Sequence, residues 1–163
     1  MNKPKTEKIG MKTKNLLLIG SAALIPTPAA ILADFGLFYI FIRVFAAMTE
    51  NRDRSLFVVE AVLWILCGVL FPGIEWITWR IFRRTGMLGK KELHIALLAG
   101  AVVYAIAMAL LFPASLDILF VYLPKSELGP GLSLLFFQLA AYAAAAVCGI
   151  VHAIGVWTGT KEK

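Results

Sequence analysis

Four long apolar stretches, separated by short charged segments, constrain the fold of this chain more than any other feature. They cover about residues 28–48, 56–81, 93–112 and 132–157. Each approaches the roughly twenty apolar residues that a helix needs to cross about 30 Å of hydrocarbon. The pattern predicts an all-α, polytopic membrane protein.

The composition agrees with this architecture. Of the 163 residues, 60% are apolar and 16% are charged, and the mean hydropathy is +0.82. Soluble domains contain about 45–50% apolar and about 25% charged residues, so the composition excludes a soluble domain. We expect one integral membrane domain over residues 1–163, folded as a compact four-transmembrane-helix bundle with a broken N-terminal apolar segment.

The positive charge is unevenly distributed along the chain. Twelve of the sixteen Lys and Arg residues fall in residues 1–14, 80–91 and 161–163, which four crossings place on one side. By the positive-inside rule, both termini and the middle loop are then cytoplasmic, and the chain is a multi-pass protein of the cell inner membrane. The net charge of +6 thus reflects orientation and contact with anionic lipid, and it does not indicate a nucleic-acid partner.

The N-terminal apolar segment is ambiguous. Residues 16–47 would be roughly 48 Å long as one helix, which is too long for one straight crossing. Pro26-Thr27-Pro28 predicts a break, because proline disfavours helix just before it and threonine can cap a new helix. We expect the first crossing at 28–48 and an inner-interface or re-entrant segment at 16–25. The alternative is a cleaved signal peptide within residues 1–30.

Prolines and aromatic residues define the other expected boundaries. Pro72-Gly73 predicts a kinked or broken second helix that continues toward its inner end. Trp76 and Trp79 precede a basic run there, which is the order expected at a cytoplasmic interface. Residues 113–131 are expected to form the outer loop, with an apolar helix at 116–123 on the membrane surface.

Small residues recur every four positions in the fourth span. They form a stripe of Ala141, Ala145, Gly149 and Ala153, and alanines at 101, 105 and 109 form a similar stripe in the third span. In lipid, such faces let helices approach closely. We expect the two spans to pack together within the chain. Homo-oligomerisation or docking on a larger membrane partner is the alternative.

Ionisable side chains inside the spans are the candidate functional residues. Each charge costs at least about 2.5 kcal/mol at the bilayer centre unless it is paired or hydrated. In the outer half of the membrane, Arg43 and Glu60 lie at similar estimated depths in their spans. We expect these two side chains to form an ion pair that sets helix register, with an outer-side substrate or proton site as the alternative.

The inner half contains a second group of ionisable side chains. Asp34 and His152 lie at similar estimated depths in the membrane. Glu75 and His94 lie nearer the cytoplasmic boundary. A carboxylate beside an imidazole can relay protons or bind a cation. The alternative is a set of dispersed polar groups that form structural hydrogen bonds.

No further motif indicates a chemistry. Cys67 and Cys148 both lie inside spans and are interpreted as small packing residues. Neither histidine belongs to a metal-binding spacing, and the chain has no phosphate-binding glycine loop and no nucleophile elbow. We therefore expect no catalytic residue, no metal site and no cofactor.

These observations rank several functions. The leading hypothesis is a non-enzymatic inner-membrane protein that acts through helix or outer-loop contacts with another membrane protein or with itself. It would be an accessory subunit or an immunity protein against a membrane-inserting toxin. The alternative is a small proton- or cation-linked carrier or channel that uses Asp34, Glu60, Glu75 or His152. An intramembrane enzyme without a recognisable motif is the third hypothesis.

Overall fold

Helices make up the described structure. The computed structural model describes residues 16–48, 55–122 and 128–158, and all statements below concern these residues. Its long helices are α2 (Pro26–Met48), α3 (Ser55–Thr85), α4 (Lys90–Tyr122) and α5 (Leu128–Thr158). Four helical stretches are long and apolar enough to cross a membrane: Leu16–Ile40, Trp64–Thr85, Lys90–Ala114 and Leu134–Thr158. The prediction of an all-α chain with four such helices is confirmed.

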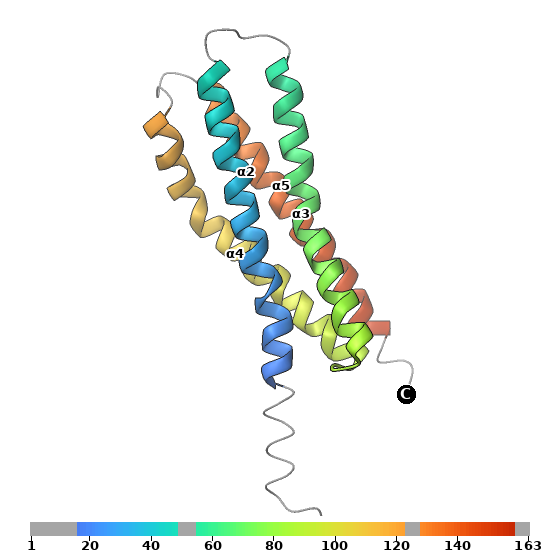
Figure 1. The fold of residues 1–163 in the computed structure, drawn as a ribbon. Helices are drawn as coiled ribbons and strands as arrows, with labels where there is room; N and C mark the ends of the chain where they lie inside the picture. The colour runs from blue at the N-terminus through green and yellow to red at the C-terminus, as the bar shows by residue number, and fades with distance from the viewer. Residues whose placement is uncertain (1–15, 49–54, 123–127, 159–163) are drawn as a thin grey trace, which may run out of the picture.

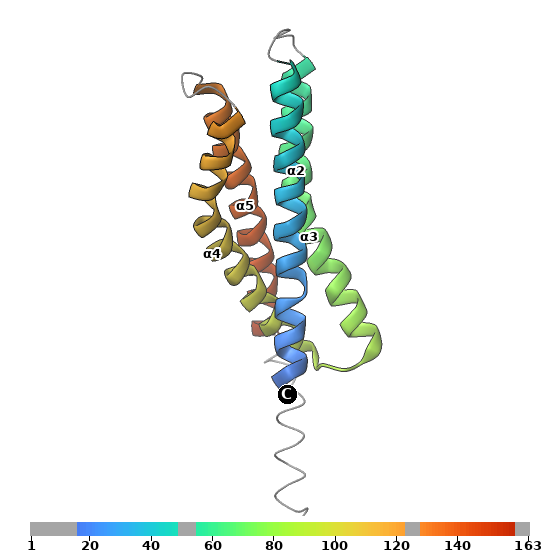
Figure 2. The same ribbon diagram turned by 60° about the vertical axis from the view of Figure 1, so that its left-hand side comes forward.

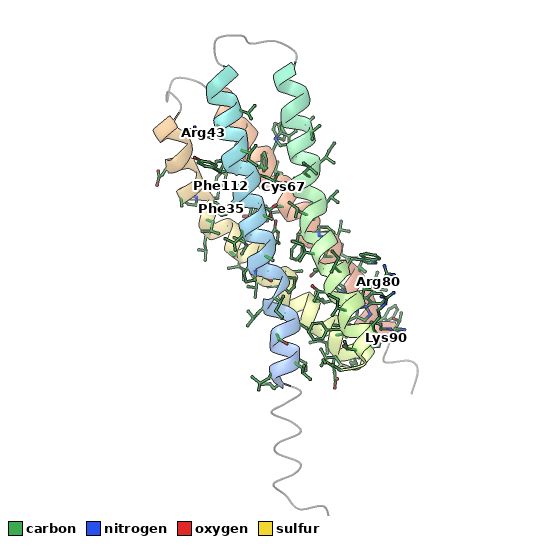
Figure 3. The ribbon with its side chains drawn as sticks, viewed as in Figure 1. Phe35, Arg43, Cys67, Arg80, Lys90 and Phe112 are labelled. Atoms are coloured by element: carbon green, nitrogen blue, oxygen red, sulfur yellow. The ribbon has the colours of Figure 1, made fainter. Side chains whose placement is uncertain are left out.

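The four helices form an antiparallel bundle (Figures 1 and 2). α2 and α5 each pack against both α3 and α4, and the contact between α4 and α5 is the most extensive. The α3–α4 turn and the end of α5 lie at one end of the bundle (Figure 1). Arg80 and Lys90 mark this end, which we call the basic end, whereas Arg43 lies toward the opposite end (Figure 3).

The N-terminal segment differs from the expected break. Residues 16–24 are helical, a turn at Ile25 follows, and α2 continues in nearly the same direction (Figure 2). The backbone N–H of Ile25 still donates to Ser21 at 2.9 Å, and the Thr27 hydroxyl reaches the carbonyl oxygen of Ala23 at 3.1 Å. The helix is thus interrupted at Ile25 without a change of direction, although Pro26 and Pro28 lack N–H donors. The helical stretch long and apolar enough to cross a membrane thus runs over Leu16–Ile40, whereas the first crossing was expected at 28–48.

A close backbone contact holds this N-terminal helical segment against α4. The Thr27 hydroxyl also lies 3.3 Å from the carbonyl oxygen of Gly100. A Cβ atom added at Gly100 would lie 3.0 Å from the backbone oxygen of Ala23. Glycine is thus required for this approach, which the sequence did not reveal.

Two other boundaries also differ from expectation. α4 contains Pro113 and ends at Tyr122, and α5 already begins at Leu128. Within the range expected as the outer loop, 113–131, residues 113–122 thus continue α4 and residues 128–131 belong to α5, so the helix expected at 116–123 is not a separate element. A proline removes one backbone hydrogen bond but does not end a helix that is otherwise apolar and helix-forming. α3 likewise continues through Pro72 to Thr85.

The α3–α4 turn determines how the basic ends of these helices meet. Gly86 ends α3 with a positive φ of 62°, the left-handed conformation that favours glycine after a helix. The backbone N–H of Gly89 donates to the Glu92 carboxylate at 3.1 Å, which is half of a capping box at the start of α4. This short turn places the first turns of α4 beside the last turns of α3.

The bundle has an apolar exterior and a partly polar interior. Leu32 and Leu110 are each 73% exposed. Tyr104 and Phe71 are completely buried and lie in a core cluster of small and aromatic residues shared by all four helices. Several buried side chains are nevertheless ionisable, namely Asp34, Glu75, His94 and His152. This distribution is the reverse of that in a soluble bundle, where charged side chains are almost never fully buried.

Candidate functional site

Three ionisable side chains from three helices form a hydrogen-bonded chain near the basic end. Nε2 of His152 on α5 lies 3.1 Å from Oε2 of Glu75 on α3. Nδ1 of the same imidazole lies 3.1 Å from Nδ1 of His94 on α4. Glu75 is 2% exposed, and the two histidines are 7% and 9% exposed. The chain Glu75–His152–His94 is thus almost completely shielded.

The proton positions in this hydrogen-bonded triad depend on whether Glu75 is ionised. When Glu75 is ionised, Nε2 of His152 carries the hydrogen that it donates to the carboxylate. In a neutral His152, Nδ1 is then an acceptor, and Nδ1–H of His94 donates to it. A proton that binds Nε2 of His94 lets the Nδ1 proton of that ring move to His152. The arrangement can therefore pass one proton from His94 to an imidazolium paired with Glu75.

Gly155 on α5 packs directly against the His94 ring. A Cβ atom at this position would lie 2.6–2.7 Å from three atoms of the imidazole, which is closer than any real contact of this kind. The absence of a side chain at Gly155 therefore lets the His94 ring lie flat beside α5 and reach His152. Sequence reasoning missed this role, since Gly155 lies outside the predicted stripe.

A cavity of about 410 Å³ borders the hydrogen-bonded side chains of Glu75, His152 and His94. Glu75, His94, His152 and Cys148 contribute its polar groups, and the remaining lining is apolar and aromatic, formed by Pro72, Trp76, Trp79, Val147 and Val151. Oε1 of Glu75 is buried and accepts no hydrogen bond of ordinary geometry from the described residues, although the Cys148 thiol lies beside this carboxyl group. An acceptor that is buried without a donor at a cavity wall can be satisfied by a ligand.

Two arginines hold the aromatic wall of the cavity. The guanidinium of Arg80 lies 5.1 Å from the Trp76 ring centre, and that of Arg83 lies 5.9 Å from the Trp79 ring centre. Both distances suit cation–π contacts. The wall of the cavity thus continues into the positive charge of the basic end.

A second polar cluster surrounds Asp34 on α2, farther from the basic end. Its carboxyl group accepts hydrogen bonds from the Tyr104 hydroxyl on α4 and from the Cys67 thiol on α3, the latter at 3.1 Å. Tyr104 stacks on Phe71 with ring centres 4.1 Å apart, which fixes its orientation. Cys67, interpreted from the sequence as a packing residue, is therefore also a hydrogen-bond donor.

The structure does not pair Asp34 with His152, although their estimated depths match. Asp34 belongs to the cluster of Tyr104 and Cys67, whereas His152 belongs to the chain with Glu75 and His94. Depth follows from counting residues, but contact also depends on how each helix is rotated. The structure therefore gives Asp34 and His152 different hydrogen-bond partners.

The outer-half pair cannot be assessed in the same way. Arg43 is exposed in α2. The side chain of Glu60 lies outside the described part of the structure, so the Arg43–Glu60 pair stays a prediction.

The small-residue stripe of α5 lies partly in the interior. Ala141 and Ala145 are buried in the core cluster, Gly149 is half-buried near Leu98, and Ala153 is exposed. Tyr104 and Gln138 lie on the same faces as the two stripes, three residues from Ala101 and from Ala141. This spacing is the sequence signal by which both polar residues could have been placed in the interior.

No described group of three or more His, Cys, Asp or Glu side chains is arranged to hold a metal ion. Comparison of the chain with protein-family models, with curated proteins and with solved structures gave no match. The function must therefore be inferred from the two polar clusters and the cavity.

Proposed function

We propose that the protein is a small proton-linked carrier of the cell inner membrane that binds a largely apolar molecule in the 410 Å³ cavity. In this proposal the four apolar helices cross the membrane with both termini in the cytoplasm, as the positive-inside rule predicts. The basic end then faces the cytoplasm, and the cavity lies in the inner half of the membrane.

The observation that supports the proposal most strongly is the Glu75–His152–His94 chain at the cavity wall. An acidic group in a membrane helix costs about 2.5–3.5 kcal/mol on insertion scales. The cost for Asp34 and Glu75 together approaches the whole stability of a marginal protein. A protein that acts only through helix contacts has no need for this cost, whereas a proton-linked carrier needs titratable groups beside its binding site.

The ligand chemistry follows from the groups at the cavity wall. The apolar and aromatic lining favours a small apolar body, and tryptophan faces suit a ring system. Oε1 of Glu75 is buried at this wall and accepts no hydrogen bond of ordinary geometry from the described residues. We therefore expect a ligand with an apolar ring and a hydroxyl or N–H group that donates to Glu75.

Coupling to a proton arises because ligand and proton act on the same carboxylate. A ligand donor stabilises the ionised form of Glu75. A proton on His152 also stabilises that form through the ion pair, so the proton position changes when the ligand binds. The charged groups that face the two imidazoles are Glu75 and Arg83 from α3 and Lys90 from α4. Entry of a proton through His94 links this exchange to the cytoplasmic side.

The test measures binding of para-bromophenol, whose bromine quenches the fluorescence of nearby tryptophans, to the protein in detergent. Bromobenzene serves as the matched probe without a donor. We expect para-bromophenol to quench Trp76 and Trp79 at lower concentration than bromobenzene. Glu75→Gln should weaken para-bromophenol binding about tenfold, since a hydrogen bond to a charged group is replaced by one to a neutral amide. Asp117→Asn, which changes an exposed carboxylate of α4 far from the cavity, should bind as wild type.

Proton linkage is measured by calorimetric titration of the probe into the protein in two buffers with different ionisation enthalpies. Transport is measured as the probe-dependent flux of protons into liposomes that contain the protein and a trapped pH-sensitive dye. Subtraction of the flux in Glu75→Gln liposomes removes the probe's own permeation. Equal affinity for the two probes, or no difference in proton exchange between wild type and Glu75→Gln, would contradict the proposal.

An interaction protein is the second candidate function, favoured by a groove on the α4–α5 face. The groove has a volume of about 260 Å³ and is lined mainly by small residues, among them Ala101, Ala105, Ala146 and Gly149. Such a surface fits a helix of another membrane protein or of a second copy. Ala146→Leu would fill the groove; loss of a cross-linked complex in cells with proton flux unchanged would favour this candidate.

A further inference from the structure

All four long helices contribute a polar side chain to one layer around Asp34. Cys67 and Tyr104 donate to its carboxyl group from α3 and α4. Gln138 comes from α5, and it lines the same small cavity as Asp34 and Cys67. None of these four residues belongs to the hydrogen-bonded group of Glu75, His152 and His94 at the basic end.

Gln138 has an amide group that is not satisfied by the described residues. The side chain is only 7% exposed, and its Nε2 atom has no hydrogen-bond partner among them. Buried polar groups in folded proteins nearly always have a partner, either from the protein or from ordered water. The amide therefore needs an acceptor within the cavity that it lines.

The cavity has the size of one water molecule. About 20 Å³ is open to the centre of a water-sized sphere, and a bound water needs about 10–15 Å³ on this measure. Phe38 and Phe137 also line the cavity, and their rings meet edge to face with centres 6.3 Å apart. The lining thus combines the polar side chains of Asp34, Cys67 and Gln138 with apolar side chains.

We propose that this cavity binds one water molecule, which accepts a hydrogen bond from Gln138 and donates one to Asp34. The water gives the carboxylate a third donor beside Tyr104 and Cys67. It also serves the other protonation state, because a water molecule can accept from a protonated carboxyl group as readily as it donates to an ionised one. Asp34 thereby becomes a hydrated proton-holding site.

Other occupants fit the cavity less well. A dry cavity leaves the amide without a partner. A metal cation prefers a shell of several oxygen ligands, whereas this cavity offers one carboxyl group, one amide and a thiol. Exchanging the amide oxygen and nitrogen of Gln138 changes nothing, because water can also donate to an amide oxygen.

Cys148 links the packing of the two polar regions. Cys148 packs in the same core cluster as Tyr104, and it also lines the large cavity with Glu75 and His152. Cys148 thus belongs both to the core cluster that contains Tyr104 and to the wall of the large cavity. The water site itself rests on the Gln138 amide and its cavity, and it does not depend on the carrier proposal.

The test uses the fact that Gln138 is the only glutamine in the chain. Protein labelled with isotope-enriched glutamine gives one pair of side-chain amide signals in nuclear magnetic resonance spectra. We expect direct dipolar transfer from a long-lived water to these amide protons in detergent micelles. Rotating-frame spectra distinguish such transfer by its sign from chemical exchange with solvent. Amide signals without dipolar transfer from water would overturn the proposal.

A stability measurement provides the second readout. Gln138→Met keeps the size of the side chain but removes its hydrogen-bonding groups, and Leu139→Met is the matched control at the neighbouring exposed position. Gln138→Met should lower the midpoint of thermal unfolding relative to the control, because the bridge to Asp34 is lost. In a dry cavity the same change removes an unpaired amide and raises the midpoint. A midpoint at or above that of the control would therefore also overturn the proposal.

Discussion

Replacing Gly155 by alanine should destabilise the protein through the His94 ring. The new Cβ atom would lie 2.6–2.7 Å from three ring atoms, whereas carbon atoms in contact are about 3.5–4.0 Å apart. Relieving an overlap of this size typically costs about 1–3 kcal/mol. Alanine also favours helix over glycine by up to about 1 kcal/mol, which partly offsets the loss.

Gly149→Ala isolates the steric effect, because it lies in the same helix and gains the same helix propensity. Its nearest non-local atom is a methyl carbon of Leu98 at 3.8 Å, which is an ordinary contact. The difference in unfolding free energy between Gly149→Ala and Gly155→Ala should therefore equal the overpacking cost, about 1–3 kcal/mol.

The assay is reversible unfolding of the purified protein in mixed micelles, followed by far-ultraviolet circular dichroism. Both glycine variants are also measured with His94→Ala, which removes the ring and should abolish the difference between them. The reasoning is refuted if Gly155→Ala is as stable as Gly149→Ala. It is equally refuted if the difference persists without the imidazole.

Three further predictions concern packing, topology and the outer ion pair. Gly100→Ala should cost about 1–3 kcal/mol, since its Cβ atom would lie 3.0 Å from the backbone oxygen of Ala23 in the N-terminal helical segment; the same unfolding assay measures this, and unchanged stability would contradict it. A cysteine introduced at Ser126 should react with an impermeant thiol reagent in intact cells, whereas one at Gly89 should react only after the membrane is opened; the reverse pattern would invert the proposed topology. Arg43→Glu or Glu60→Arg alone should lower stability more than the two exchanged together, because each single reversal places two like charges opposite each other; additive effects in this double-mutant cycle would exclude the pair.

Much of the architecture follows from local properties of the chain. Apolar stretches of about twenty residues predict membrane-length helices wherever they occur, since helix hydrogen bonds form between residues four apart. The four helices were predictable for this reason. Proline signals were less reliable, because one lost hydrogen bond does not end a helix that is otherwise apolar and helix-forming. Just before Pro26 the helix is interrupted, but its direction is kept.

The candidate site depended on information that the sequence does not contain. The residue types and approximate depths of Asp34, Glu75 and His152 identified them as candidates. Their partners depend on the rotation and crossing of helices far apart in the chain, which set Asp34 beside Tyr104 and Glu75 beside His152. The packing of small residues decides these rotations. Gly155 leaves room for the His94 ring to approach His152, and Gly100 lets α4 approach the N-terminal helical segment. Ionisable residues inside apolar helices could thus be found from the sequence, because burial of charge in lipid is costly wherever it occurs. Only the tertiary structure assigned their contacts, because those result from side-chain packing between helices.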